Sequence, residues 1–319
     1  MKVSVIIPFY NVEKYIRKCL QSLQAQTLQE IEFILVNDGS KDKSESIAKE
    51  FLCDSRFQLL VKKNGGLSDA RNYGLQAATG EYIAYLDSDD YVEANMYESM
   101  YKRAIESDAD VVECNFIWEY PNKAVIDTKT VKNNLLLDIR VVAWNKLYKS
   151  SFLKPLHLIF PIGYQYEDVN YCYKMLPYIK KFISIEEPFV HYIQRSNSIS
   201  NNQNEKVRDI FYILNDSIHY YKEKGFYETY KAELEYLYIR YLLGSSFKRI
   251  IMIPNKTLRK NILNENWNLL NTTYPNWKHN KYLKTLKTKK NTYFKFTNKC
   301  IYLLNAKVLR ILLRLKSNG

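Results

Sequence analysis

Residues 82–90 read YIAYLDSDD, an apolar segment that ends in three carboxylates, Asp87, Asp89 and Asp90. Carboxylates this close together repel one another at neutral pH, and aspartate is unfavourable within strands, so the cluster requires a solvated turn or a cation. One interpretation is an acidic turn that caps a helix beginning near Glu93. The other is a site for Mg²⁺ or Mn²⁺, which prefer oxygen ligands and take several of them from water and substrate phosphates. The second interpretation predicts a nucleotide-diphosphate substrate.

This segment is the fourth strand in a regular alternation of strands and helices. Nearly continuous apolar strands separated by short helices are typical of a parallel sheet with helices on both faces. The sequence therefore predicts an α/β fold. The expected strands are 3–10 (VSVIIPFY), 31–38 (IEFILVND), 57–63 (FQLLVKK) and 82–87 (YIAYLD), and the expected helices pass through Ile16, Leu20 and Leu23 and cover 43–51 and 67–78.

Polar residues follow each predicted strand. Ligands of parallel α/β sheets bind beyond the carboxyl ends of the strands, so we expect these residues to line one crevice. They are Pro8, Tyr10 and Asn11 after the first strand, Asn37 to Ser40 after the second, Asn64 to Gly66 after the third, and Asp87 to Asp90 after the fourth.

Four segments in this order resemble the motifs of the family 2 glycosyltransferases of bacterial capsule, teichoic acid and exopolysaccharide synthesis. They are IIPFYN (6–11), VNDGSKD (36–42), NGGLSDARNYG (64–74) and YLDSDD (85–90), and WNKLYKSSFL (144–153) and YEDVNY (166–171) resemble downstream segments. The resemblance covers about the first 200 residues. It implies a GT-A fold, a Rossmann-like and mostly parallel sheet with helices on both faces. It also implies transfer of a sugar from a nucleotide-sugar, usually a UDP-sugar, with inversion at the anomeric carbon.

Several residues of these motifs are candidates for binding the nucleotide-sugar. Asp38 can accept a hydrogen bond from a uracil imide or contact the ribose, although Asp before Gly and Ser is also a common helix cap. Arg71 follows the glycine pair, where a cation favours phosphate or nucleotide oxygens; the alternative is a surface arginine. The resemblance implies that Asp87 contacts the nucleotide and that Asp89 carries the metal. The other expected donor-binding residues are Pro8, Tyr10, Asn11 and Asn64.

An inverting transfer also needs a general base that takes the proton of the acceptor hydroxyl. Asp168, the second acid of the resembling YEDVNY segment, is our candidate, and Glu167 is expected to orient the acceptor or to exchange roles with it. Without the resemblance, both acids would be read as favourable charges at a helix N-terminus.

The segment HYIQRSNSIS (191–200) supplies the last candidates. The resemblance implies that it lies over the diphosphate, with His191 at the metal and with Arg195 and Ser198 near phosphate oxygens. A single histidine beside an apolar strand is otherwise a structural residue more often than a ligand. His157, His219 and His279 have no metal-like spacing.

Composition suggests how the chain is organised. We expect a catalytic domain over residues 1–203, with nucleotide-sugar binding in 1–90 and the acceptor and catalytic part in 91–203, followed by a helical region over 204–319. The boundary is placed in the polar cluster SNSISNNQN. Five scattered cysteines indicate no disulfide framework and fit a reducing cytosol. The first strand begins at once and no apolar stretch is long enough to span a membrane, so neither a signal peptide nor a membrane span is expected.

Charge is concentrated at the end of the chain. The net charge is +13, and the last acidic residue is Glu265. Residues 278–319 contain 12 basic residues, which leaves 35 basic and 34 acidic residues before them. Within this tail, aliphatic residues recur at intervals of three and four, which predicts a basic amphipathic helix. They are Ile301, Leu304, Val308, Ile311, Leu312 and Leu315, with Lys307, Arg310 and Arg314 on another face.

Such a helix can lie on an anionic membrane, and a lipid-linked acceptor would make that attachment useful. It can also pack on the protein's own helices or on a second copy of the chain. Nucleic acid is not expected as a partner, because no nucleic-acid-binding module is recognised. The predicted location is therefore cytoplasmic and peripheral on the inner face of the cell membrane.

These observations together predict an inverting, metal-assisted glycosyltransferase that uses Mn²⁺ or Mg²⁺ and acts on a cell-surface glycan or a lipid-linked acceptor. A hexosyl- or N-acetylhexosaminyltransferase fits. The alternative from another class is a non-catalytic nucleotide-sugar- or glycan-binding protein derived from the same fold. A nucleotidyltransferase is disfavoured, because no early glycine-rich phosphate loop with a following lysine is present.

Overall fold

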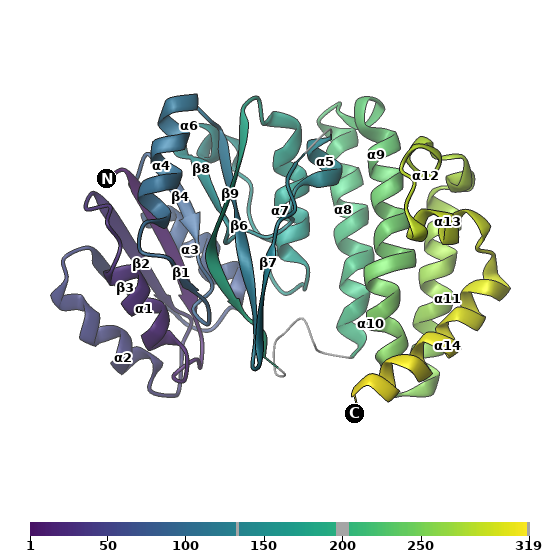
Figure 1. The fold of residues 1–319 in the computed structure, drawn as a ribbon, viewed down its shortest axis with the longest axis horizontal. Helices are drawn as coiled ribbons and strands as arrows, with labels where there is room; N and C mark the ends of the chain where they lie inside the picture. The colour runs from purple at the N-terminus through teal and green to yellow at the C-terminus, as the bar shows by residue number, and fades with distance from the viewer. Residues whose placement is uncertain (132–133, 196–203, 318–319) are drawn as a thin grey trace. The chain divides into compact units, whose positions relative to one another are not determined.

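The structure is a computed structural model that describes residues 1–131, 134–195 and 204–317. The chain forms two compact units (Figure 1). The first consists of residues 1–163 and 167–195, and the second of residues 164–166 with the described part of 196–319. The boundary predicted after residue 203 lies in a stretch outside the described residues.

The first unit is built on one sheet. Its strands are β1 (Val3–Phe9), β2 (Ile31–Asn37), β3 (Phe57–Val61), β4 (Tyr82–Tyr85), β5 (Tyr91–Val92), β6 (Val111–Tyr120), β7 (Lys123–Asp127), β8 (Lys146–Lys149) and β9 (Phe182–Ile193). Its helices are α1 (Ile16–Gln24), α2 (Ser44–Glu50), α3 (Leu67–Ala77), α4 (Met96–Ser107), α5 (Leu135–Asp138), α6 (Ser150–Leu153) and α7 (Glu167–Met175). The strand order is β3-β2-β1-β4-β8-β6-β9-β5, and β7 pairs with β6.

The four strands predicted from the sequence are adjacent and parallel, as expected. The rest of the sheet corrects the expectation of a mostly parallel sheet. β8 is antiparallel to both β4 and β6, β5 is antiparallel to β9, and β7 is antiparallel to β6, whereas β6 and β9 are parallel. The sequence did not reveal this because β5, β7 and β8 are short and lack a long apolar run, and because strand direction depends on partners that are distant in sequence.

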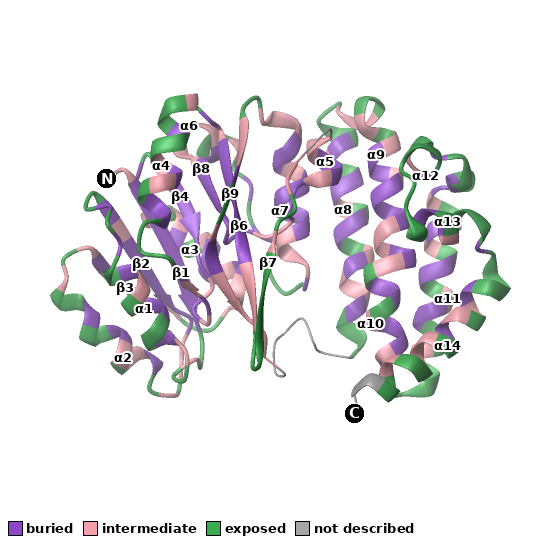
Figure 2. Ribbon diagram, in the orientation of Figure 1, coloured by how far each residue is buried: buried purple, intermediate pink, exposed green. Residues whose placement is uncertain are grey.

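Helices cover both faces of the central strands (Figure 1). Val3, Val5 and Ile7 of β1 belong to one buried cluster with residues of α1 and α4. The alternate residue Ile6 faces α3, where an added Cβ at Gly74 would lie 2.5 Å from Ile6 Cγ2. Both faces of β1 are therefore buried, which explains its continuous apolar sequence. Figure 2 shows these strands as buried and the β7 edge as exposed.

The second unit is helical. Its helices are α8 (Asp209–Glu223), α9 (Tyr227–Arg240), α10 (Ser246–Met252), α11 (Lys256–Thr273), α12 (Lys281–Thr285), α13 (Lys289–Phe296) and α14 (Lys299–Ser317). A π-helical segment at Tyr241–Ser245 joins α9 to α10. Leu214, Ile218 and Tyr221 of α8 are buried and are spaced by three and four residues, as on one face of a helix. No helix of the described residues is long and apolar enough to cross a membrane.

Three residues from the middle of the chain belong to this helical unit. The Tyr164 ring stacks on Tyr212, with ring centroids 4.0 Å apart. The backbone N–H of Gln165 donates to Asp209, and its side-chain oxygen accepts from Arg249 at 3.0 Å. The Arg249 guanidinium lies 4.6 Å from the centre of the Tyr166 ring. The helical unit therefore holds the segment that directly precedes Glu167 and Asp168.

Candidate functional site

Asp38 organises the loop that follows β3. Its buried carboxylate accepts hydrogen bonds from the backbone N–H groups of Gly65 at 2.9 Å and Gly66 at 2.7 Å. Lys62 donates to the same carboxylate at 2.8 Å and pairs with Asp69. Gly66, with φ +91, precedes the first residue of α3 in a conformation that suits glycine. The alternative role of Asp38 as a cap for the next helix is not what the structure shows, because its carboxylate binds the glycine loop instead.

Arg71 is the centre of the site. It lies on the buried face of α3, where its side chain is fully buried, so it is not a surface arginine. Nη2 donates to Asp87 at 2.7 Å, and Nη1 donates to Asp168 at 2.6 Å and to Glu167 at 3.2 Å. The Phe160 ring lies beneath the guanidinium, at 5.1 Å. One arginine thus joins the carboxylate at the end of β4 to both acids at the start of α7.

Burial shapes the proton affinity of this acidic pair. The side chains of Glu167 and Asp168 are only 17% and 16% exposed. Loss of hydration raises the pKa of both carboxyls, and the Arg71 guanidinium opposes that rise. The proximity of Asp168 further raises the pKa of Glu167, and the proximity of Asp87 further raises that of Asp168. A carboxyl that is partly reachable and has a raised pKa is suited to take up a proton.

A buried ionic network lies beside the backbone segment that contacts Asp168. The backbone N–H of Ala143 donates to Asp168 Oδ2 at 3.2 Å. Lys146, fully buried, donates to the carbonyls of Arg140 and Val142 at 2.6 and 2.8 Å and pairs with Glu113 at 3.0 Å. Lys146 therefore holds the backbone that directly precedes Ala143. No role was expected for Lys146, because the short strand KLYK carries a lysine at each end and its sequence does not show which of the two is buried.

The remaining acids of YLDSDD have separate partners. Asp89 forms an ion pair with Arg195, whose guanidinium lies 4.6 Å from the centre of the Tyr15 ring. Asp90 is buried and accepts a hydrogen bond from the Ile193 backbone N–H at 2.8 Å. Burial raises the pKa of Asp90 well above its usual range, and the nearby Asp87 adds to the effect. Asp90 thus secures the end of β9 beside β5, whereas Asp89 remains partly accessible.

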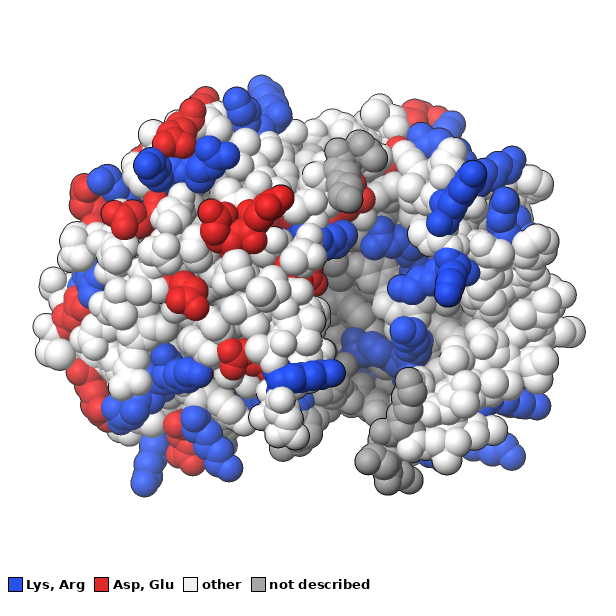
Figure 3. Space-filling view, in the orientation of Figure 1, with Lys and Arg blue, Asp and Glu red and all other residues white. Residues whose placement is uncertain are grey.

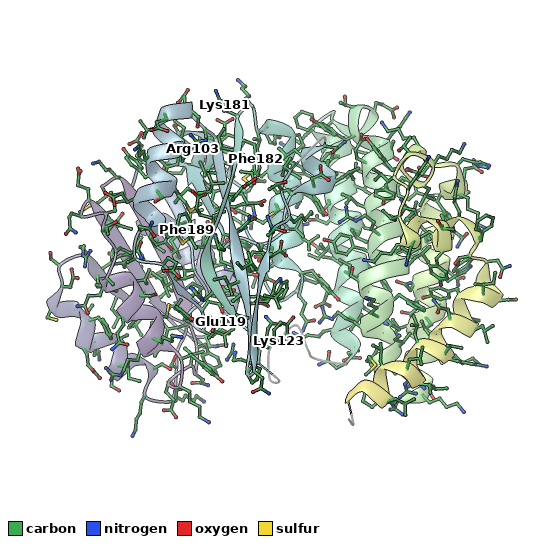
Figure 4. All side chains as sticks on the ribbon, in the orientation of Figure 1. Arg103, Glu119, Lys123, Lys181, Phe182 and Phe189 are labelled. Carbon is green, nitrogen blue, oxygen red and sulfur yellow. The ribbon has the colours of Figure 1, made fainter. Side chains whose placement is uncertain are left out.

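His191 lies in a different group of side chains. Its Nδ1 is 2.6 Å from Glu119, which is near the end of β6 (Figure 4), and its Nε2 is 2.7 Å from Glu93. The ring also stacks on Tyr91, with centroids 4.2 Å apart. Both ring nitrogens are engaged by carboxylates, so this arrangement gives no support to the expectation that His191 binds the metal.

The other predicted binding residues surround the ends of β1 and β2. Pro8 is buried within β1, and Tyr10 beyond it is 44% exposed. Asn11 has a positive φ of 51° and accepts from the Lys41 backbone N–H at 2.8 Å, so it supports the loop after β2. Asn64 is exposed and donates to the Asp38 carbonyl at 2.9 Å. Ser198 lies outside the described residues.

The chemistry of the carboxylates that follow β4 fits a hard divalent cation. Asp87 and Asp89 supply carboxylate oxygens, the ligands that Mg²⁺ and Mn²⁺ prefer. Among the residues that the structure describes, no group of three or more His, Cys, Asp or Glu side chains forms a metal cage.

Known proteins resemble this chain in sequence and in fold. Residues 4–155 match the family model "Glycosyl transferase family 2". The putative glycosyltransferase EpsH of Bacillus subtilis is 31% identical over 255 residues, which are 73% of each chain. A longer glycosyltransferase of Streptococcus pneumoniae is matched over 64% of this chain but only 32% of its own length.

Two solved structures show the likeness in three dimensions. TarS (residues 1–349) of Staphylococcus aureus, in complex with UDP-GlcNAc, has a TM-score of 0.62 at 20% identity, covering 92% of this chain and 78% of TarS. The mannosyltransferase PcManGT of Pyrobaculum calidifontis, in complex with GDP-Man and Mn²⁺, has a TM-score of 0.54 at 16% identity, covering 96% and 86%. At these identities the likeness shows the fold alone, which is of the GT-A type with an additional helical region. The family model and the sequence relatives together show that the chain belongs to glycosyl transferase family 2.

Proposed function

We propose that this protein transfers a hexosyl or N-acetylhexosaminyl group from a UDP-sugar, with inversion, to a hydroxyl group of a cell-surface glycan or a lipid-linked acceptor. The observation that carries the proposal is the convergence of Asp87, Glu167 and Asp168 on the buried Arg71 beyond the end of β4. The sequence relatives support sugar transfer. The chemistry of the site supports the finer assignments.

The donor is proposed to bind along the ends of β1, β2 and β4. Asp38 and its glycine loop, together with Tyr10, form the nucleotide side, and Asp87 contacts the ribose. Asp89 would hold a Mn²⁺ or Mg²⁺ ion, and such an ion would neutralise charge on the leaving diphosphate. Arg195, now paired with Asp89, is released to contact phosphate oxygens.

The acceptor is proposed to bind beside the pair at the start of α7. Asp168 takes the proton of the attacking hydroxyl as that oxygen forms its bond to the anomeric carbon and the bond to the diphosphate breaks. Attack from the face opposite the leaving group produces inversion. Arg71 and the Ala143 N–H keep the Asp168 carboxylate in one orientation, and Glu167 contacts the acceptor.

Donor hydrolysis tests the assignment of class and donor. The purified protein is incubated with UDP-, GDP-, CMP- and dTDP-sugars in Mn²⁺, Mg²⁺ or EDTA, and the released nucleotide is measured. We expect metal-dependent release of UDP from one sugar, and nuclear magnetic resonance of the transfer product should show an inverted anomeric centre. Asp89→Asn should abolish the metal dependence of UDP binding.

The alternative outcomes separate the rival functions. Calorimetric UDP binding without hydrolysis of any donor would mean that the acceptor is required for turnover. Absence of both binding and hydrolysis would favour a non-catalytic protein derived from this fold. Unchanged metal-dependent binding in Asp89→Asn would remove Asp89 from the metal site.

A further inference from the structure

Helix α14 has two apolar faces, and only one of them is used within its unit. Tyr302 and Ala306 are buried. The Tyr302 ring lies 4.8 Å from Phe247 and 5.1 Å from Trp267, and its hydroxyl accepts a hydrogen bond from Asn266 at 2.8 Å. These contacts hold one side of α14 against α10 and α11.

The second apolar face is exposed. Six aliphatic side chains, each 40–68% exposed, occupy one side of α14: Ile301, Leu304, Val308, Ile311, Leu312 and Leu315. At 100° per residue they fall within one arc of about 100°, and at 1.5 Å per residue the arc is about 21 Å long. No charged residue lies within it. Of the alternatives for this face, packing on the protein's own helices does not fit the described residues, because all six side chains are exposed.

Phe296, shortly before α14 in the chain, is another exposed apolar side chain. It ends α13 and is 73% exposed, although Phe294, two residues earlier, is buried. Figure 2 shows α14 as largely exposed or intermediate. Isolated exposed hydrophobic residues need no explanation, but a contiguous face of six marks an interaction surface.

The surroundings of this face are cationic. Lys307 and Arg314 are exposed beside the arc, and no acidic residue follows Glu265. Lys and Arg side chains outnumber acidic ones on the visible surface of the helical unit (Figure 3). Four more lysines line a cavity of about 420 Å³ between α12 and α13: Lys284, Lys287, Lys289 and Lys295. The occupant of this surface must therefore be apolar and anionic at once.

We propose that α14 lies in the interface of an anionic lipid leaflet. Its aliphatic face inserts among the acyl chains, and the surrounding lysines and arginines lie against lipid phosphates. A symmetric contact with a second copy fits less well, because it would bring the same cations together with no acidic residue of the tail to neutralise them. The proposal identifies the surface that would bring the enzyme to a lipid-linked acceptor, but it does not depend on the sugar chemistry.

Vesicle co-sedimentation of the full chain, without donor or acceptor, tests this proposal. We expect binding to vesicles of phosphatidylglycerol and phosphatidylcholine, and much weaker binding to phosphatidylcholine alone. Leu304→Ser/Val308→Ser/Leu315→Ser should weaken binding by about tenfold or more. Lys307→Gln/Arg314→Gln should weaken it less and reduce its dependence on salt.

Matched controls remove the same groups elsewhere. Val125→Ser/Ile126→Ser takes two exposed aliphatic side chains from β7, and Lys256→Gln/Lys260→Gln takes two exposed cations from α11. Both should bind vesicles like the unmodified protein. Circular dichroism melts check that every variant is folded, as expected for substitutions at exposed positions.

Three results would overturn the proposal. The unmodified protein could fail to bind anionic vesicles. The aliphatic triple variant could bind as well as the unmodified protein, which would mean attraction by charge alone. Sedimentation equilibrium could show an oligomer that the triple variant dissociates, with no vesicle binding by either protein; the face would then be an interface between copies. Vesicle binding is measured without donor or acceptor. A negative result in the donor-hydrolysis assay would therefore leave these three outcomes unchanged.

Discussion

At the scale of single residues, the site depends on one cation serving three carboxylates. Arg71 carries no exposed surface, and its partners come from two other segments of the chain. Removing one member of a buried ionic group typically costs about 3–5 kcal/mol because another charge is left unpaired. Arg71 substitutions are therefore poor probes of catalysis, whereas isosteric changes of the partly exposed acids are good ones.

The first prediction concerns Asp168→Asn. The amide keeps the size of the side chain but cannot take up a proton, so kcat should fall by about 10²- to 10⁴-fold. UDP binding by calorimetry should change little, because Asp168 is assigned to the acceptor side. Glu187→Gln, the same kind of acid-to-amide change at an exposed position of β9, serves as a neutral control for handling and folding. Near-normal turnover by Asp168→Asn would refute its role as the base.

The second prediction is the pH dependence of turnover. The base must be ionised to act, so kcat should fall as the solution is acidified through the apparent pKa of the Glu167–Asp168 pair. Burial raises the pKa of both carboxyls, so the loss should begin at a higher pH than for an ordinary exposed carboxyl. The measurement is a pH profile of kcat under donor saturation. A profile that stays flat down to the range of exposed carboxyls would contradict the assignment.

At the scale of elements, helix α3 sets the position of Arg71 through its close approach to the sheet. Arg71 and Gly74 lie one turn apart on the buried face of this helix. A Cβ at position 74 would lie 2.5 Å from Ile6 and 3.0 Å from Val36. The helix can therefore hold its arginine over the end of β4 only while position 74 has no side chain.

The third prediction follows for Gly74→Ala. Alanine improves helix propensity by about 1 kcal/mol, but forcing a methyl group into a packed interface costs about 1–3 kcal/mol or more. The steric cost should exceed the gain, so stability should fall in urea titrations and turnover should fall with it. Gln76→Ala, at an exposed position of the same helix, should be neutral or slightly stabilising. A Gly74→Ala variant with full stability and activity would show that α3 adjusts freely.

At the scale of the whole molecule, residues of the helical unit hold the segment that precedes the proposed catalytic pair, Glu167 and Asp168. Tyr166 has a positive φ of 65° and directly precedes Glu167 in the chain. Its neighbours Tyr164 and Gln165 are also held by helices of the second unit. Residues 164–166 precede the boundary expected after residue 203, yet they pack with the helices of the second unit.

The fourth prediction is that Arg249→Ala impairs turnover although Arg249 belongs to the helical unit. The variant loses the hydrogen bond to Gln165 and the cation–π contact with Tyr166. Looser placement of the following acids should lower kcat by about tenfold to a hundredfold, with UDP affinity unchanged. Lys248→Ala removes an exposed cation from the same helix and should leave kcat intact. Equal kcat values for Arg249→Ala and Lys248→Ala would show that the contacts of Arg249 do not affect turnover.

The sequence by itself determined the first four strands, their helices and the helical character of the second unit. Parallel strands that are buried on both faces form continuous apolar runs, and helices repeat apolar residues every three or four positions. Both patterns can be recognised from residues that are close in sequence. The ordered motifs also indicated the family. In the same way, the aliphatic arc of α14 was readable from spacing alone, because a helix converts spacing into position on a face.

Only the tertiary structure decided which side chains meet. The antiparallel pairing of β8, the engagement of His191 by Glu93 and Glu119, and the network around Lys146 all join residues that are distant in sequence. So does the meeting of Arg71 with acids at positions 87, 167 and 168. The aliphatic face of α14 remained ambiguous until the structure showed that the helix packs through its other side. A local sequence pattern indicates that a face is apolar. The packing of the whole chain decides which apolar faces are covered and which charged side chains meet.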